Sequence, residues 1–248
     1  MIKREVIGRY RGSVLGIIWS FFNPMLMLAV YTFFFSVVFN ARWGGGTGDK
    51  SEFAILIFSG MIVHALFAEC IGRAPGLILS NVNYVKKVVF PLQILPVVAL
   101  GAALFHTVVS FGVLLVFYVL VYGHLNWTVI FLPLIIVPYL IVILGFSWFL
   151  ASVGVYLRDV GQTTAILVTL LMFVSPVFYP ISAVPEAFRP LLQLNPLTFI
   201  IEQTRDVVIW NRLPAWGGLA LYWLAGAAIG WAGLFWFQKA RKGFADVL

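Results

Sequence analysis

The sequence predicts an all-α, polytopic membrane protein, and three observations lead to this fold class. Hydrophobic residues make up 62% of the 248 residues and charged residues only 10%, whereas an ordinary soluble domain is about 25% charged. The mean hydropathy is +1.02. Long apolar runs fill almost the whole chain, and a soluble core could not hide that much apolar surface from water. We therefore expect residues 1–248 to form a single transmembrane domain.

Six apolar stretches reach the length of about 20 residues that a helix needs to cross the hydrocarbon core. They lie at residues 16–39, 53–72, 94–122, 129–157, 163–181 and 216–237. The first is too long for the apolar part of a signal peptide, and no small-residue cleavage site follows it, so we expect it to remain as a span. The sequence therefore predicts six transmembrane helices.

The distribution of lysine and arginine predicts the orientation. With a cytoplasmic N-terminus, the inner segments hold eleven cations: Lys3, Arg4, Arg9, Arg11, Arg73, Lys86, Lys87, Arg158, Lys239, Arg241 and Lys242. The outer segments then hold five: Arg42, Lys50, Arg189, Arg205 and Arg212. Because cytoplasmic segments carry the excess of these residues, both termini are expected in the cytoplasm, which requires an even number of spans. The same bias accounts for the net charge of +7 without a nucleic-acid partner.

The N-terminal segment, residues 1–12, is predicted to form a basic amphipathic helix at the membrane interface. Ile2, Val6 and Tyr10 share one helical face at i, i+4 and i+8. The cations of this segment are Lys3, Arg4, Arg9 and Arg11. They either set the topology alone or bind an anionic lipid headgroup or phosphate, for which arginine has a suitable geometry.

Glu69 and Arg73, at the end of the second stretch, are spaced i, i+4 and can pair on one helix face. A carboxylate inside a span costs about 2.5–3.5 kcal/mol on insertion scales, so it needs a partner or water. We interpret the two as a structural pair near the interface. A proton relay would need further ionisable groups along a path, for which only His64 and His106 are available.

The inner segment 80–96 reads SNVNYVKKVVFPLQILP. Asn81 or Asn83 can cap a short helix here, and two prolines end it. A short, exposed helix at this place could be the contact site of a soluble motor subunit. The alternative interpretation is an ordinary interfacial loop. The candidate contact residues are Asn81, Asn83, Tyr84, Lys86 and Lys87.

The other inner connection, residues 156–162, is short and reads YLRDVGQ. Arg158 and Asp159 are the only charged residues between Lys87 and Glu186. We expect them to form a structural pair, in which a charge-assisted hydrogen bond holds a tight turn between the fourth and fifth stretches.

The longest outer connection, residues 182–214, follows the fifth stretch and is rich in proline. Its apolar runs at 191–194 and 197–201 are too short to cross, so they predict re-entrant or interfacial helices. Non-helical backbone at membrane depth is tolerated only beside protein or a water-filled cavity. This region is therefore expected to line or close the outer mouth of a pathway, with Glu186, Arg189, Glu202 and Arg205 as candidate gate residues.

Aromatic residues make up 17% of the chain. Trp and Tyr near the ends of spans are normal belt residues, but the density in and near the first stretch is greater than a belt requires. Aromatic faces stack on flat or apolar surfaces, including those of sugar rings. A path for a glycan is the functional hypothesis, and its candidate residues are Trp19, Phe22, Tyr31, Phe35, Phe178 and Tyr179.

Several chemical motifs are missing from the sequence. There is no G-x-x-x-x-G-K-[ST], so we expect that this chain does not bind ATP by itself. There is no H-E-x-x-H motif, and no group of residues in the sequence suggests a catalytic or metal-ligating set. Cys70 is the only cysteine. We therefore expect a transport protein without a catalytic site, a metal or a cofactor of its own.

Five segments resemble the membrane subunits of ABC-2-type polysaccharide exporters, in the order of that family and over nearly the full chain. They are RYRGSVLGIIWSFFNPM (9–25), RAPGLILSNVNYVKKVVFPLQILP (73–96), YLRDVGQ (156–162), SPVFYP (175–180) and LNPLTFIIEQTRD (194–206). The greatest likeness is to exporters of lipid-linked O-antigen, with capsule and teichoic-acid exporters next.

This resemblance implies a homodimer in the bacterial inner membrane, paired with two copies of a separate subunit that binds ATP and Mg²⁺. It implies an interface helix at 1–10, a coupling helix for the ATPase within 80–90, and two short re-entrant outer helices within 185–210. The implied substrate is a polysaccharide on an undecaprenyl-pyrophosphate carrier.

Two other classes remain open at the sequence level. An ion-coupled secondary transporter would need acidic groups inside the membrane, and Glu69 is the sole candidate. A membrane-embedded enzyme acting on lipid-linked sugars would need a cluster of carboxylates or histidines near one interface, which the sequence does not display.

Overall fold

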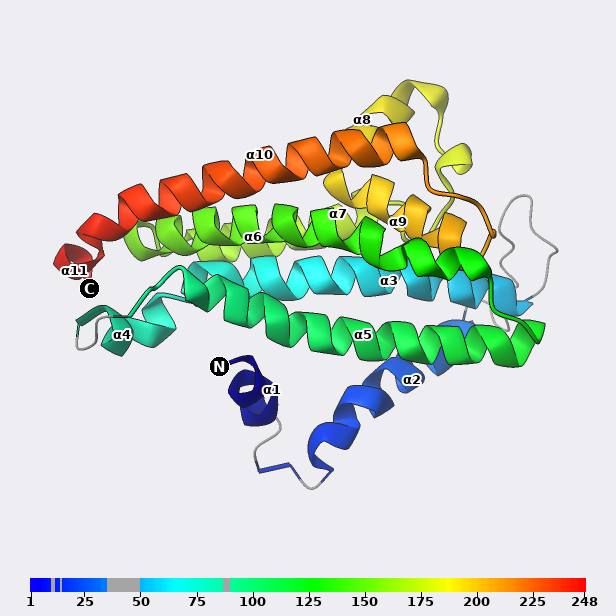
Figure 1. Cartoon of the computed structure of the whole chain (residues 1–248), viewed down its shortest axis with the longest axis horizontal. Coiled ribbons are helices and arrows are strands. Elements are labelled where there is room, and N and C mark those ends of the chain that lie inside the picture. Colours follow the sequence, from blue (N-terminus) through cyan, green and yellow to red (C-terminus); the bar gives the residue numbers. More distant parts are fainter. Residues whose placement is uncertain (10–11, 14, 35–49, 87–89) are drawn as a thin grey trace.

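In the computed structural model, every regular element in the described residues (1–9, 12–13, 15–34, 50–86 and 90–248) is helical. The α-helices are α1 (Ile2–Arg9), α2 (Trp19–Tyr31), α3 (Lys50–Arg73), α4 (Val82–Lys86), α5 (Ile94–Tyr122), α6 (Leu132–Tyr156), α7 (Val160–Val174), α8 (Arg189–Leu194), α9 (Pro196–Val208), α10 (Trp216–Ala240) and α11 (Phe244–Val247). The long helices run side by side along the molecule (Figure 1). The all-α prediction is therefore confirmed for these residues.

Five segments in the described residues are long and apolar enough to cross a membrane. They are Gly16–Phe34, Ser51–Gly76, Ile94–Tyr122, Trp127–Tyr156 and Trp216–Gly243. Each coincides with a predicted span, and the bounds of α5 equal the prediction. Residues 35–39 of the first predicted span lie outside the described residues.

The fifth predicted span, residues 163–181, differs from the structure. α7 has only 15 residues and ends at Val174, so at 1.5 Å per residue it is about 22 Å long, shorter than a hydrocarbon core of about 30 Å. Ser175 takes an extended conformation, with φ −84° and ψ 150°. Pro176 follows, and a proline disfavours the helical conformation for the residue before it. The prediction of one continuous helix to residue 181 was wrong for this reason.

α3 lies at the centre of the bundle and α2 at its edge (Figure 1). Within an 18-residue apolar stretch of each segment, 78% of the residues are buried in the segment that includes α3, against 11% in the segment that includes α2. The main core packs around α3, with buried side chains from α5, α6 and α9. α1 packs on α5, where a Cβ added to Gly101 would meet the side chain of Ile2.

α6 and α10 cross closely because glycines remove side chains from their contact. A Cβ added to Gly233 would meet the carbonyl oxygen of Gly145, and one added to Gly226 would lie 3.0 Å from that of Pro138. Small residues of this kind let helix backbones approach within a membrane. This contact fixes α10 against α6.

Buried hydrogen bonds tie α9 to the turn between α5 and α6. The Asn126 side-chain amide donates to the hydroxyl of Tyr118 and to the carbonyl of Val208, both at 3.0 Å. The Thr128 hydroxyl donates to the Val207 carbonyl at 2.6 Å. Polar groups buried away from water need such partners, so this end of the bundle is held by a specific network.

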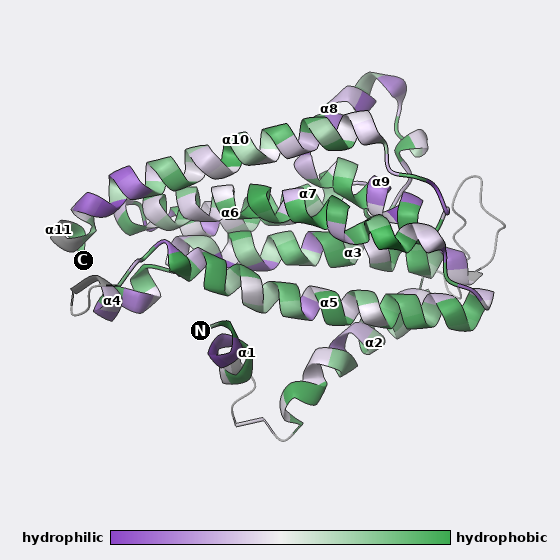
Figure 2. Ribbon diagram, viewed as in Figure 1, coloured by the Kyte–Doolittle hydropathy of each residue, from purple (hydrophilic) through white to green (hydrophobic). Residues whose placement is uncertain are grey.

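Polar residues gather toward both ends of the bundle, and apolar residues cover its middle (Figure 2). α4 and the C-terminal residues lie at one end, which we call the α4 end, and α1 lies in the same half of the molecule (Figure 1). This banded distribution is that of a multi-pass membrane protein.

Candidate functional site

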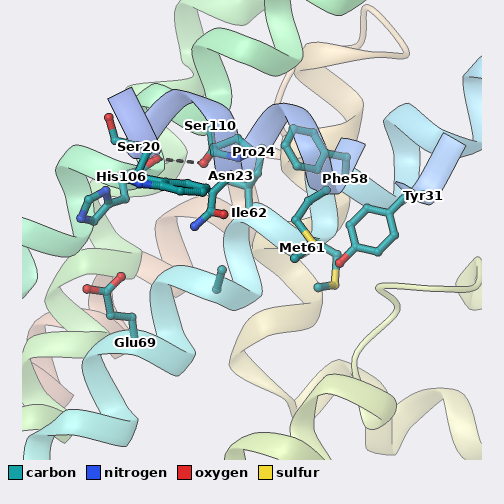
Figure 3. Close-up of a pocket in the computed structure, with 13 residues that line it drawn as sticks. Ser20, Asn23, Pro24, Tyr31, Phe58, Met61, Ile62, Glu69, His106 and Ser110 are labelled. Carbon is teal, nitrogen blue, oxygen red and sulfur yellow. Dashed lines mark hydrogen bonds between the residues drawn. The ribbon is translucent and has the colours of Figure 1, made fainter. Parts of the chain in front are cut away.

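A pocket of about 370 Å³ lies between α2, α3 and α5 (Figure 3). We call it the central pocket. Its aromatic lining residues are Trp19, Tyr31 and Phe58, and its polar ones are Ser20, Asn23, Glu69, His106 and Ser110. Figure 3 shows Asn23, Glu69 and His106 facing the same space from three different helices.

The spacing of the lining residues explains why the pocket forms. α2 contributes residues 19, 20, 23, 24, 27 and 31, and α3 contributes residues 58, 61, 62, 65 and 69. Both sets follow the i, i+3, i+4 pattern of a single helical face. Phe58 and Glu69 are eleven residues apart, so the pocket extends for about 16 Å along α3. This is about half the thickness of a hydrocarbon core.

Two polar side chains of the central pocket, Glu69 and Ser110, have partners on their own helices. Glu69 lies 3.8 Å from the Arg73 guanidinium, one turn further along α3. The Ser110 hydroxyl donates to the backbone carbonyl of His106 at 2.9 Å. The pocket thus combines aromatic faces with hydrogen-bonding side chains, a lining that can orient a polar organic ligand.

The structure brings two of the six predicted path aromatics into this pocket, Trp19 and Tyr31. Phe22 packs edge-to-face on Trp19, with ring centroids 5.5 Å apart. Phe178 and Tyr179 follow α7, where the Tyr179 hydroxyl donates to the carbonyl of Phe173 at 2.9 Å. Phe35 lies outside the described residues.

A second pocket, of about 450 Å³, lies at the α4 end between α1, α5 and the segment after α3. We call it the end pocket. Its polar lining residues are Arg4, Glu5, Arg73, Ser80, Asn81 and Tyr84. The basic N-terminal helix and the candidate coupling segment, predicted as separate sites, therefore meet at one place.

The remaining residues of those two predicted sites lie around or beyond the end pocket. Lys3 lines a neighbouring hollow together with Arg4, and Asn83 is exposed on α4. The side chains of Arg9 and Lys86, at the ends of α1 and α4, lie outside the described part of the chain, as do Arg11 and Lys87.

Arg205 of α9, a predicted gate residue, is 1% exposed. Its guanidinium donates to the carbonyls of Leu56, Pro176 and Val177 and pairs with Glu202 at 2.9 Å. Burial lowers the pKa of Arg205 to about 10, which leaves the group protonated at neutral pH. Arg205 thus joins α9 to α3 and to the extended segment after α7.

Two other predicted gate residues, Glu186 and Arg189, lie nearer the surface. Arg189 is 3.5 Å from Glu186, and its Nε donates to the Val184 carbonyl at 2.9 Å. The Glu186 side chain is 89% exposed, so water screens this pair. Of the four predicted gate residues, Arg205 is therefore buried, whereas Glu186 faces the solvent.

Residues 1–209 match the family described as "ABC-2 type transporter". The chain belongs to the ABC-2 type transporter family. It is 30% identical to the O-antigen export system permease protein RfbA of Myxococcus xanthus, over 99% of this chain and 93% of that protein. A second RfbA, from Klebsiella pneumoniae, is 26% identical over 99% of this chain and 92% of the relative. The polysialic acid transport protein KpsM of Escherichia coli is 25% identical over 91% of this chain and 85% of the relative.

The tight turn of this ABC-2 chain between α6 and α7 is held by its backbone. The amides of Gly161 and Gln162 donate to the carbonyls of Arg158 and Asp159, at 3.4 and 3.1 Å. No ion pair within 4.0 Å links the Arg158 and Asp159 side chains in the described structure. The side-chain bond expected there is replaced by main-chain bonds.

Sequence reasoning missed four polar residues that line the two pockets of the ABC-2 chain: Ser20, Asn23, Ser110 and Glu5. One signal was available. His106 and Ser110 stand i, i+4 in an otherwise apolar run, which places two polar groups on one helix face. That this face meets α2 and α3 depends on tertiary packing, which no local spacing reveals.

Proposed function

We propose that this ABC-2 chain is the membrane subunit of an ATP-driven exporter. Its proposed substrate is a polysaccharide linked to undecaprenyl pyrophosphate, moved from the inner to the outer leaflet of the bacterial cytoplasmic membrane. The observation that carries the proposal is the aromatic and polar central pocket inside the apolar bundle. A glycan presents both hydroxyl groups and flat ring faces, which such a lining can bind. The likeness to permeases named for O-antigen export supports this choice of substrate.

The proposed assembly is a homodimer with two copies of a separate ATP-binding subunit, which supplies the sites for ATP and Mg²⁺. The absence of a phosphate-binding G-x-x-x-x-G-K-[ST] motif from the sequence supports a separate ATPase. The α4 end is assigned to the cytoplasm because the segments that gather there carry the excess of cations. α4 then serves as the coupling helix that contacts the ATPase.

The proposed route begins at α1. Lys3 and Arg4, with Arg9 and Arg11, receive the pyrophosphate of the carrier, because arginine pairs well with phosphate oxygens. The glycan then passes the aromatic residues of the central pocket. α7 with the segment after it makes the sixth crossing, and α8 and α9 act as the re-entrant helices that close the outer mouth.

Reconstitution of the chain with its ATPase partner in vesicles tests this function. Lipid-linked glycan is supplied in one leaflet, and its appearance in the other is followed with a glycan-degrading enzyme that does not cross the membrane. We expect transfer that requires ATP and is lost when the phosphate-binding lysine of the ATPase is replaced. Transfer that continues without ATP hydrolysis would contradict the proposal.

A matched pair of tryptophan variants tests the role of the central pocket in the same assay. Trp19→Ala removes an aromatic face from the pocket and is expected to lower transfer about ten-fold, since stacking on a ring contributes about 1–3 kcal/mol. Trp231→Ala is the control, because Trp231 is 70% exposed on α10. Equal rates for the two variants would remove the pocket from the glycan path.

One observation favours a rival, a proton-coupled transporter: Glu69 and His106 line the same pocket. Ionisable groups inside a membrane often form proton relays. The vesicle assay separates the two functions, because a proton-coupled transporter would work with an imposed proton gradient and no ATP.

A further inference from the structure

Arg73 stands where the membrane core meets the segment that leads to α4. It is the last residue of α3, the most buried long helix. The next residues, Ala74–Gly76, form a 3-10 helix that packs on α6, where a Cβ added to Gly154 would meet the carbonyl of Pro75. This junction is therefore one place where a movement of the α4 segment can reach the core of the bundle.

The Arg73 guanidinium is shared unequally by two carboxylates. Its Nη2 donates to Glu5 of α1 at 2.6 Å, while its Nη1 lies 3.8 Å from Glu69 of the same helix. Nη1 is buried and makes no hydrogen bond to any described residue. A donor that is out of water and without an acceptor favours a shift that would satisfy it, and the Glu69 carboxylate lies 3.8 Å away.

The two carboxylates belong to different pockets. Glu69 lines the central pocket, whereas Glu5 and Arg73 line the end pocket together with Ser80, Asn81 and Tyr84. The Glu5 and Arg73 side chains are each 38% exposed. Ion pairs as exposed as this contribute little to the stability of the fold. A contribution to stability therefore does not by itself explain why Arg73 and Glu5 are paired here.

We infer that Arg73 is the positioning residue that connects the ATPase-facing segment to both the N-terminal helix and the central pocket. This inference rests on the proposed function. In the present structure the guanidinium holds α1 through Glu5. When the α4 segment moves, Arg73 closes on Glu69, which releases α1 and withdraws the Glu69 carboxylate from ligands in the central pocket. In this inference the bond that Nη2 makes to Glu5 is lost as the 3.8 Å contact between Nη1 and Glu69 shortens, and this exchange follows the ATPase.

A double-mutant cycle in the reconstituted complex tests the role of Arg73. The variants are Arg73→Gln, Glu5→Gln and the two combined, with Arg73→Lys as the conservative variant. Two quantities are measured: the transfer of lipid-linked glycan, and the ATP hydrolysed for each glycan moved. Arg241→Gln is the control, because Arg241 is an exposed cation at the same end that bonds only Gln93 among the described residues.

We expect Arg73→Gln to lower transfer about ten-fold and to raise the ATP used per glycan, with assembly of the complex intact. The loss of transfer in the double variant should be no larger than the loss in the more impaired of the two single variants, because each single variant already removes the Arg73–Glu5 interaction. Arg73→Lys should recover part of the loss, and Arg241→Gln should match the wild type.

Three outcomes would overturn the inference: wild-type transfer by Arg73→Gln, losses that multiply in the double variant, or loss of assembly in proportion to loss of transfer. The last would give Arg73 a purely structural role. These outcomes are distinct from failure of the proposed function, in which the wild-type complex itself shows no ATP-dependent transfer.

Discussion

At the scale of single residues, the side chain with the greatest structural consequence is Arg205. It brings a positive charge into the interior and compensates for this by bonding three backbone carbonyls and one carboxylate. Its position in a charged outer stretch made it a gate candidate from sequence. Its burial could not be predicted, because it depends on α9 packing against α3.

Replacing Arg205 should destabilise the protein. Arg205→Met leaves the carbonyls of Pro176 and Val177 without the donor they have now, removes one of the donors to the Leu56 carbonyl, and takes the ion-pair partner from Glu202. We expect this to cost about 3–5 kcal/mol. Arg205→Lys should cost less, because it keeps the charge but loses the planar fork. Thermal unfolding in detergent measures the loss of stability in each of the two variants.

The matched control for Arg205 is Arg189→Met, which breaks the exposed pair with Glu186 and should cost less than about 1 kcal/mol. If Arg205→Met and Arg189→Met melted at the same temperature, the description of Arg205 as a buried anchor would be wrong.

At the scale of elements, hydropathy predicts where the long helices lie, and packing decides how they end. The span at 94–122 was predicted to the residue, since Gly123 adopts the left-handed conformation that ends helices, with φ 75°. The end of the helix predicted at 163–181 was not predicted correctly, because an average over hydropathy gives no weight to Pro176. The central pocket was predicted only in part, since its lining comes from three helices whose contact is not local.

The crossing of α6 and α10 gives a prediction at the element scale. Gly233→Ala places a methyl group against the carbonyl of Gly145, whereas Gly217→Ala, in the same helix, meets nothing within 4 Å. We expect Gly233→Ala to cost about 1–3 kcal/mol through overpacking and Gly217→Ala to change stability by less than about 0.5 kcal/mol. Protein level in membranes and melting temperature report the difference, and equal behaviour would show that the two backbones separate easily.

At the scale of the whole molecule, the two pockets follow one another from the α4 end toward the middle of the bundle. The end pocket joins the basic N-terminal helix to the segment before α4, and the central pocket begins one turn away, at Glu69, and extends toward Tyr31. A ligand whose charged head docks beside α1 and whose glycan enters the central pocket would follow this direction. The family relationship and five of the six apolar helices could be predicted from the sequence, but the proximity of these pockets required the folded chain.

The central claim is that the glycan passes through the central pocket during ATP-driven export. A photo-activated cross-linking amino acid in place of Met61, which lines the pocket, tests it directly, with Leu221, 68% exposed on α10, as the matched position. The account predicts cross-links to glycan at Met61 that appear only when the complex is hydrolysing ATP, and none at Leu221. Cross-links of equal yield at both positions, or at Leu221 alone, would contradict it.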